Sequence, residues 1–484
     1  MKATIFDEPK LDFAYRSSHV DPRAGITDYG PVDLGVSNAP TQIRVGVIGS
    51  AEAAAGVLDW LRRCRRTIDA KANNKHPHLF RGFPGFTRDC AFRSELIFDD
   101  EWTRVLSNRQ LRRVLTKPVS LATAECVDLY HREIADLAEK GVVDVILIAR
   151  PDDLEDDIPP AKRSRSEELE ESTRVPQAHV DFHDLLKAAT IVTGVPLQLI
   201  RSTTWDPSRQ TAKTRSRRSP SIQDEATRAW NLHTALYYKA GGIPWRVSRE
   251  SGDLDSLYVG VSFFHSTDRG EVHTSVAQIF DERGEGVVVR GGPAARQKDD
   301  RQPHLRRQDA EGLLGEALDT YVREHQHYPA RVVLHKTSQF DDEEVSGFES
   351  AVDERHIRHL ELLWIVDASE GTRLFRKGDY PVLRGTFASI GERRHILYTR
   401  GSVEFYRVYP GMYIPTPLGI RPAVTERSIE HLAEEVLALS KMNWNQSQLD
   451  GRLPITLRAS RKVAGILKNL PDGSPASGRY AMFM

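Results

Sequence analysis

The sequence predicts an α/β protein of two domains, and three observations lead to this prediction. Helix-like and strand-like segments alternate between residues 43 and 247, as in a doubly wound sheet with helices on both faces. From residue 257 the pattern changes to three strands with short turns, followed by alternating helices and strands. The length of 484 residues exceeds the usual size of a single domain, so more than one hydrophobic core is expected.

Charge and cysteine content limit the class of protein. With 67 basic and 68 acidic residues, the chain carries almost no net charge, which argues against a uniformly basic nucleic-acid coat but allows local clusters. The cysteines Cys64, Cys90 and Cys126 form neither a CxxC pair nor a disulfide framework, so we expect a reducing, cytoplasmic location. Neither a signal peptide nor an apolar run of membrane-spanning length appears, and no membrane association is expected.

The first domain is predicted from repeated pairs of helix and strand. The run IRVGVIGS, residues 43–50, has the β-branched character of a buried strand, and the alanine-rich segment that follows through Leu61 is predicted to be a helix. Three helix-and-strand pairs follow: 122–139 with 142–149, 181–193 with 195–200, and 230–240 with the residues PWRV. We therefore place an extended segment that packs on the core at residues 1–41, the first domain at 42–247 and the second at 248–484.

Two polar stretches interrupt the first domain. Residues 152–172 are acidic, then basic, then acidic, without periodic apolar residues, and are predicted to be a solvated loop. Residues 208–221 contain five basic side chains, which are Arg209, Lys213, Arg215, Arg217 and Arg218. This second stretch has two interpretations: a loop that follows a phosphate backbone, or a solvated basic loop.

The second domain has a recognisable order of elements. Strands are predicted at 258–265, 272–282 and 286–291, followed by a helix at 308–324, a strand at 331–336, a helix at 342–357 and a strand at 360–368. Three antiparallel strands followed by helix, strand, helix and strand is the order found in ribonuclease-H-like domains.

One predicted helix in the first domain has a lysine in its last, C-terminal turn. The segment WNLHTALYYK contains no helix breaker, but Gly241 and Gly242 stop the helix, so Lys239 lies in the last turn. About fifty residues earlier, His183 and Lys187 lie one helical turn apart on one face. These three side chains could converge on one anion.

Taken together, these features resemble the MID and PIWI domains of a short prokaryotic Argonaute. The resemblance is strong from residue 181 to the end and architectural over residues 43–150. Its most specific segments are WNLHTALYYKAGGIPW, YVGVSF, VVLHKTSQF, IPTPL and ALSKMNWN. The resemblance implies a Rossmann-like MID domain followed by an RNase-H-like PIWI domain. Because the predicted sheet begins at residue 43, no N or PAZ module is expected before it.

The resemblance also implies a binding site for the 5′-phosphate of a guide strand. In this family the site has a histidine or aromatic residue, a lysine four positions later, a glutamine on the next strand and a second lysine on a later helix. The matching positions are His183, Lys187, Gln198 and Lys239. Relatives often carry a further glutamine where this chain has Ala235, and Asn231 is expected to replace that contact.

A magnesium ion is expected beside this phosphate. In PIWI-type proteins the terminal carboxylate can reach the MID domain and help a divalent ion to bridge guide phosphates. The last residues, Met482 to Met484, are apolar and are expected to pack rather than fray. We predict that Gln198 and the Met484 carboxylate hold Mg²⁺, with hydrophobic docking of the tail as the alternative.

The second domain lacks the carboxylates that nuclease chemistry requires. RNase-H-like cleavage uses two Mg²⁺ ions held by three or four carboxylates. An active PIWI domain would place acidic residues where this sequence has Ser262, Thr337 and, for the fourth ligand, Ser460. Because neutral hydroxyl groups cannot offset the charge of two metal ions, we predict no cleavage and no enzyme activity. The acidic residues Asp268 and 341–344 are predicted to serve a turn and a helix start instead.

The resemblance then implies a sensor. A guide RNA would detect complementary single-stranded DNA and activate a partner that carries an APAZ domain fused to an effector, either a sirtuin-like or TIR NADase or a nuclease. Such a pair would act as an obligate heterodimer in prokaryotic defence against plasmids or phage.

Two other functions remain open from the sequence. One is a catalytically active guide-directed nuclease with displaced metal ligands. The other is a nucleotide-cofactor enzyme built on VGVIGSAE near Gly46 and Gly49. That segment lacks the GxGxxG spacing and a following acidic residue for the ribose, so it is expected to be a tight turn between strand and helix.

Overall fold

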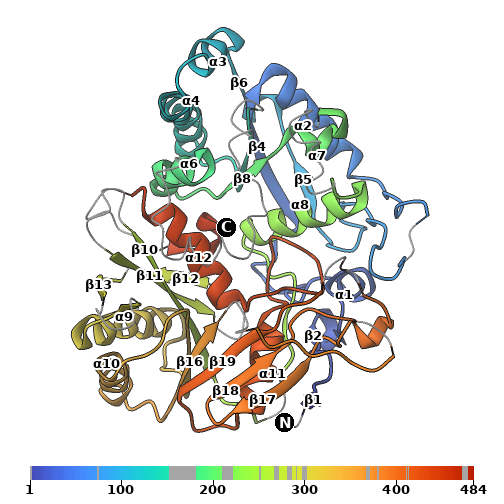
Figure 1. Cartoon of the computed structure of the whole chain (residues 1–484). Helices are drawn as coiled ribbons and strands as arrows, with labels where there is room; N and C mark the ends of the chain where they lie inside the picture. Colours follow the sequence, from blue (N-terminus) through green and yellow to red (C-terminus); the bar gives the residue numbers. More distant parts are fainter. Residues whose placement is uncertain are drawn as a thin grey trace. The chain divides into compact units, whose positions relative to one another are not determined.

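The protein divides into two compact units. The computed structural model describes residues 3–73, 76–151, 181–209, 222–249, 252–265, 272–280, 286–289, 291–296, 302–366, 371–378, 381–409, 411, 414–470 and 478–484. Unit 1 comprises Met1–Ala39, Asn74–Phe80 and Ile243–Met484, and unit 2 comprises Pro40–Asn73 and Arg81–Gly242. Figure 1 shows the elements of both units, with the chain coloured from its N-terminus to its C-terminus.

In the part of the chain that the structure describes, unit 2 is built on a parallel sheet of five strands. The strands are β4 (Gln42–Ser50), β5 (Glu95–Ile97), β6 (Thr103–Leu106), β7 (Val145–Ala149) and β8 (Leu197–Ile200). Central β4 pairs with β5 and β6 on one side and with β7 on the other, and β8 lies beyond β7. Every residue of β7 is buried, as expected for a parallel strand covered on both faces.

Helices cover both faces of this sheet. One face packs against α3 (Asn108–Leu115), α4 (Val119–Glu139) and α6 (Phe182–Thr190), with Ile48 and Ile146 among the shared core residues. On the other side of the sheet in Figure 1 lie α2 (Ala51–Arg63), α7 (Ser202–Trp205) and α8 (Glu225–Lys239). Arg228 of α8 stacks over Trp60 of α2. The predicted doubly wound layer is confirmed.

Unit 1 contains a mixed sheet whose central strands follow the ribonuclease-H-like order. Strands β10 (Ser256–His265), β11 (Val272–Phe280) and β12 (Gly286–Val289) are antiparallel neighbours. Strand β10 also pairs in parallel with β15 (Arg331–Lys336), and β15 with β16 (His359–Val366). The helices between them are α9 (Arg307–His325) and α10 (Asp342–Asp353), which share a hydrophobic core with β10, β15 and β16. The predicted order is confirmed.

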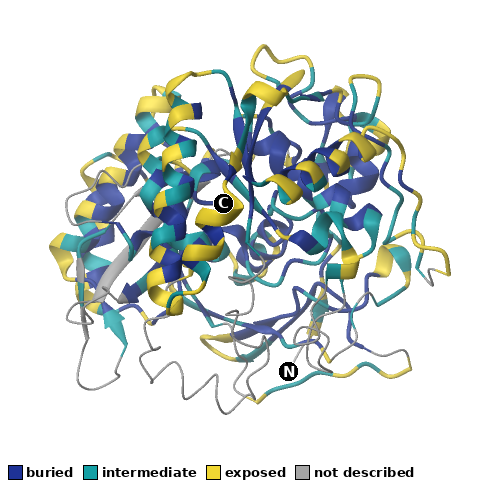
Figure 2. Ribbon diagram, turned by 90° about the horizontal axis from the view of Figure 1, so that it is seen from above, coloured by how far each residue is buried: buried dark blue, intermediate teal, exposed yellow. Residues whose placement is uncertain are grey.

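The remaining chain of unit 1 extends this sheet and covers its second face. Strands β17 (Thr386–Gly391), β18 (Arg394–Leu397) and β19 (Leu418–Val424) continue the sheet beyond β16. Helices α11 (Ile429–Leu439) and α12 (Ile455–Leu467) contribute to a second core with Leu363 and Ile365 of β16. In Figure 2 the strands of both units are mostly buried and the outer helix faces are exposed.

The N-terminal segment belongs to unit 1 and contains short strands, turns and a helix, so the expected extended segment is only partly extended. Strand β1 (Ala3–Ile5) pairs with β17, and β2 (Leu11–Asp12) pairs with β3 (Ser18–His19). Helix α1 (Pro22–Tyr29) was not predicted from the sequence, although Asp21 caps it through two backbone N–H groups and Pro22 occupies its first position.

One predicted strand pairing is wrong. The residues PWRV were expected to form the next strand of the first sheet, but β9 (Arg246–Val247) pairs with β2 in a separate small sheet that also contains β3. The chain leaves unit 2 after Gly242, and the N-terminal segment supplies the hydrogen-bonding partner instead.

The last residues pack as expected. Strand β20 (Gly478–Arg479) pairs with β12, and the short helix α13 (Tyr480–Phe483) follows it. Phe483 is fully buried, so the expectation that the tail packs rather than frays is confirmed. None of the described helices is both long enough and apolar enough to cross a membrane. The cysteines Cys64, Cys90 and Cys126 form no disulfide among the described residues.

Helix α12 approaches β10 so closely that only glycine fits at residue 260. A Cβ atom there would lie 2.2 Å from the carbonyl oxygen of Thr456. We expect Gly260→Ala to lower the free energy of unfolding by about 2 kcal/mol or more, because backbone must move. Gly312→Ala is the matched control. Gly312 is exposed within α9 with no atom within 4 Å of its added Cβ, so this change should stabilise by about 0.5–1 kcal/mol. Urea denaturation measures both, and equal effects would contradict this account.

Candidate functional site

Helix α6 and strand β8 carry the first three predicted phosphate-binding residues. Asp181 caps α6 by accepting a hydrogen bond from the backbone N–H of His183. His183 is half-buried, and its Nδ1 lies 2.8 Å from Oδ1 of Asp184. Lys187 follows one turn later and is only 2% exposed. Gln198 lies on β8, the next strand, so the predicted order of helix, turn and strand is present.

Helix α8 carries the second predicted lysine at its end. Asp224 caps the start of the helix, and Lys239 is its last residue. Gly241 follows with a φ of +96°, a left-handed conformation that favours glycine and ends the helix. Lys239 is fully buried. A buried ammonium group is costly without polar partners. Lys187 and Lys239 thus place two buried cationic side chains within unit 2.

Gln198 has an unsatisfied acceptor. Its Nε2 donates to the carbonyl oxygen of Leu199 at 2.9 Å, whereas its buried Oε1 accepts no hydrogen bond from any described residue. Gln198 is in register with Leu147 of β7. A buried oxygen without a donor is uncommon, and an amide oxygen is a suitable ligand for Mg²⁺.

Asn231 stands apart from Lys239 on the same helix. The two residues are eight positions apart, which is roughly 12 Å along a helix axis. The Asn231 Nδ2 donates to Oε1 of Gln223 at 3.1 Å. Asn231 and Lys239 therefore do not lie side by side on α8, and a role of Asn231 beside Lys239 stays a prediction.

Unit 1 brings the three hydroxyl residues onto neighbouring elements. Ser262 lies on β10, Thr337 directly follows β15, and Ser460 lies on α12. Strands β10 and β15 pair directly, and α12 packs on β10 at Gly260. Ser262 and Ser460 are buried, and the Ser460 hydroxyl donates to the carbonyl oxygen of Leu457 at 3.2 Å. None of these three side chains supplies a carboxylate.

Three possible metal ligands lie close together in unit 1, but a lysine already pairs with one of them. Ligand atoms of His304, Asp341 and Glu344 lie within 4.8 Å of one another. Glu344, however, forms a buried ion pair with Lys336. Asp341 and Glu344 also form a capping box at the start of α10, so the interpretation of these acids as a helix start is confirmed. Asp268 lies outside the described residues.

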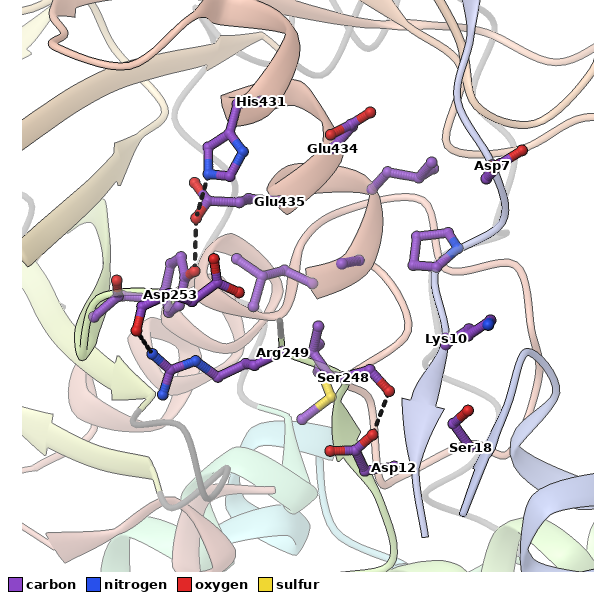
Figure 3. Close-up of a pocket in the computed structure, with 18 of the residues that line it drawn as sticks. Asp7, Lys10, Asp12, Ser18, Ser248, Arg249, Asp253, His431, Glu434 and Glu435 are labelled. Atoms are coloured by element: carbon purple, nitrogen blue, oxygen red, sulfur yellow. Dashed lines mark hydrogen bonds and ion pairs between the residues drawn. The ribbon is translucent and has the colours of Figure 1, made fainter. Parts of the chain in front are cut away.

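A charged pocket of about 810 Å³ lies within unit 1 (Figure 3). Its wall contains Glu435, which accepts hydrogen bonds from the Arg331 guanidinium and the Tyr258 hydroxyl. Burial alone would raise the pKa of Glu435, but hydrogen bonds from Arg331 and His431 lower it to about 2. None of the predicted site residues lines this pocket. Because acidic and basic residues alternate around it, it lacks the positive excess of a phosphate site.

Two buried histidines make the protein sensitive to acid. Burial lowers the pKa of both His233 and His335 to about 4. The unfolded chain therefore takes up protons between pH 6.5 and 4 that the native state does not, so stability falls as the pH drops through this range. We expect His335→Gln to remove up to about 3 kcal/mol of this fall in urea denaturation at pH 7 and pH 4. The exposed His327→Gln variant is the control, and an identical fall in all three proteins would contradict the assignment.

The remaining predictions concern the two polar stretches and the segment around Gly49. Arg209 pairs with Glu52 and Asp206, and the rest of the basic stretch lies outside the described residues, as does the acidic and basic stretch at 152–172. The segment around Gly49 is a tight strand-to-helix turn, in which Ser50 caps α2. A Cβ on Gly49 would lie 2.7 Å from the Ala149 Cβ, so close strand packing accounts for this glycine.

Curated proteins that are similar to this chain in sequence are Argonaute proteins. No family model matches the chain. The Argonaute of Cereibacter sphaeroides is 23% identical over 271 residues, which cover 51% of this chain and 34% of the relative. The Argonaute of Aquifex aeolicus is 25% identical over 241 residues, which cover 49% of this chain and 31% of the relative.

Solved structures of Argonaute and Piwi proteins are also similar to this chain. Clostridium butyricum Argonaute bound to a guide DNA and a 19-mer target DNA matches with a TM-score of 0.62 and 14% identity, over 98% of this chain and 53% of that one. Aquifex aeolicus Argonaute with externally bound siRNA matches with a TM-score of 0.59 and 16% identity, over 99% and 55%. Drosophila Piwi matches with a TM-score of 0.58 and 14% identity, over 99% and 56%.

The architecture is thus a MID domain followed by an RNase-H-like PIWI domain. The relatives found by sequence and by structure are Argonaute or Piwi proteins, so the predicted resemblance to an Argonaute is confirmed. The chain spans about half the length of the solved relatives and matches about a third of the length of the curated ones.

Proposed function

We propose that this protein binds a 5′-phosphorylated guide RNA and uses it to bind complementary single-stranded DNA. The observation that carries the proposal is the placement of Lys187, Gln198 and Lys239. They lie on a helix, on the strand that follows it and at the end of a later helix, as the guide-binding motif requires. A terminal phosphate carries nearly two negative charges, and buried lysines hydrogen-bond such a group strongly. His183 would contact the first nucleotide.

We also propose a magnesium ion at the guide 5′-phosphate. The buried Gln198 Oε1, which accepts no hydrogen bond from the described residues, fits this role. The ion would supply positive charge against the first guide phosphates. The predicted contribution of the Met484 carboxylate concerns the other unit and stays a prediction.

The protein would sense its target without cutting it. The hydroxyls of Ser262, Thr337 and Ser460 cannot hold two Mg²⁺ ions as carboxylates do, which favours a binding role. The output would come from an APAZ-domain partner with a sirtuin-like NADase, TIR NADase or nuclease effector, in defence against plasmids or phage. A reading frame for such a partner beside the gene would support this part of the proposal.

The nucleic acid that copurifies with the protein tests the binding role. We expect short RNA that becomes radiolabelled by polynucleotide kinase only after phosphatase treatment, because its 5′ ends are already phosphorylated. A bound dinucleotide without RNA would instead favour the nucleotide-cofactor enzyme.

A further inference from the structure

Helix α3 in unit 2 presents three arginines to solvent without a counter-charge. Arg109, Arg112 and Arg113 are exposed and lie at spacings of three and four residues, on the face opposite the buried Leu111 and Val114. Among the described residues, no carboxylate or other group pairs with their guanidinium groups. We call this surface the arginine face of α3.

The local sequence offers no compensation for this charge. No Asp or Glu occurs between Glu101 and Glu125, although the chain as a whole has slightly more acidic than basic residues. Several other exposed arginines of unit 2 are paired, such as Arg44 with Asp144, Arg62 with Asp59 and Arg63 with Glu225. Such an excess of one sign in a nearly neutral chain is the pattern of a surface that binds an anion.

The arginine face is also unfavourable for the isolated helix. Like charges three and four residues apart repel each other, and a cation in the first turn opposes the helix dipole. Helix α3 has Arg109 in its first turn, no acidic residue there, and no side-chain hydrogen bond from its N-cap residue Ser107. A bound anion would relieve both the repulsion and the uncapped N–H groups.

This face is separate from the proposed guide site. Helix α3 follows β6, and Gln198 lies on β8, at the opposite edge of the sheet. Three strand-to-strand steps, from β6 through β4 and β7 to β8, amount to roughly 14 Å. Figure 1 shows α3 and α8 toward opposite ends of unit 2. The arginines are therefore not further ligands of the guide 5′-phosphate.

We propose that the arginine face of α3 binds phosphates of the target strand on the 3′ side of its guide-paired segment. This inference rests on the proposed function. Pairing is antiparallel, so the target leaves the duplex on its 3′ side beside the guide 5′ end, which unit 2 holds. Ten stacked nucleotides span roughly 34 Å, more than the width of the sheet. A second copy of the chain cannot occupy this face by twofold symmetry, because like arginines would meet.

The test compares three single-stranded DNA targets on protein loaded with the same 5′-phosphorylated guide. One target is only the complement of the guide, the second adds a ten-nucleotide 3′ flank, and the third adds the same flank at the 5′ end. Dissociation constants are measured at several salt concentrations. We expect the 3′ flank to tighten binding by about tenfold at low salt and to steepen the log–log salt dependence by about 2, as three phosphate contacts on a single strand would.

Two variants complete the experiment. Arg109→Gln/Arg112→Gln/Arg113→Gln should lose the gain from the 3′ flank and keep the affinity for the unflanked target. The control is Arg44→Gln/Arg62→Gln/Arg63→Gln, which removes the same charge from three ion-paired arginines of unit 2 and should keep the gain.

Several results would overturn the inference. These are no gain from the 3′ flank in the original protein, an equal gain from the 5′ flank, or an equal loss of gain in the control variant. An unchanged gain in the α3 variant would also overturn the inference. The arginine face of α3 would then be expected to bind an acidic protein instead. Failure of the proposed function is distinguishable, because binding of the unflanked target would then not depend on the guide.

Discussion

Replacing Lys187 or Lys239 with methionine is expected to weaken binding of a 5′-phosphorylated guide roughly ten- to hundredfold. Both side chains are buried, so each would form a charge-assisted hydrogen bond to the phosphate in a poorly solvated place. Methionine keeps the volume and apolar stem of lysine and removes only the ammonium group. The fold should therefore persist while the phosphate contact is lost.

Comparison with a 5′-hydroxyl guide isolates this contact. The 5′-hydroxyl guide should lose much less affinity, because it has no terminal phosphate to contact. Lys140→Met is the control in the same unit, since Lys140 is exposed and pairs with Asp136. An equal loss of affinity for both guides in the Lys187 and Lys239 variants would refute the site assignment.

The second large effect is expected for stability in unit 1. Arg331 is 2% exposed and lies between two carboxylates, with hydrogen bonds of 2.5 and 2.8 Å to Glu435 and an ion-pair distance of 3.5 Å to Glu361. Arg331→Met would remove the cation beside the buried Glu361 and one of the two basic partners of Glu435, the other being His431. We expect the free energy of unfolding to fall by about 3–5 kcal/mol, measured by urea denaturation.

An exposed ion pair provides the comparison for this change. Arg355 pairs with the largely exposed Asp319, so Arg355→Met should change stability by at most about 1 kcal/mol. Glu361 also accepts hydrogen bonds from the backbone N–H groups of Glu426 and Arg427. A loss in Arg331→Met no larger than that in Arg355→Met would show that these carboxylates do not depend on Arg331.

Local signals explain which parts of the fold were predictable. The end of α8 at Lys239 was predictable because the two glycines and the proline that stop it follow directly in the sequence. The strand β7 was predictable because its five residues are all apolar and all buried. Short strands such as β5 and β6 were not predicted, because three or four residues carry too little pattern.

Pairing partners and buried networks were beyond sequence reasoning. The strand β9 was recognised as extended, but its partner β2 lies more than two hundred residues away in the chain. Likewise, Glu435 meets Tyr258 and Arg331 across 177 and 104 residues. Neither the burial of Lys187 nor the unsatisfied oxygen of Gln198 has a local signal, because both depend on which segments pack around them.

The most direct test of the central claim is a binding measurement with guide-loaded protein. A labelled single-stranded DNA target is incubated with protein carrying a complementary or an unrelated 5′-phosphorylated guide RNA, with Mg²⁺ or Mn²⁺ present. We predict tight binding only with the complementary guide, and recovery of the target at full length. Equal binding with both guides, or cleavage of the target at one guide-defined position, would contradict a guide-dependent sensor that does not cut.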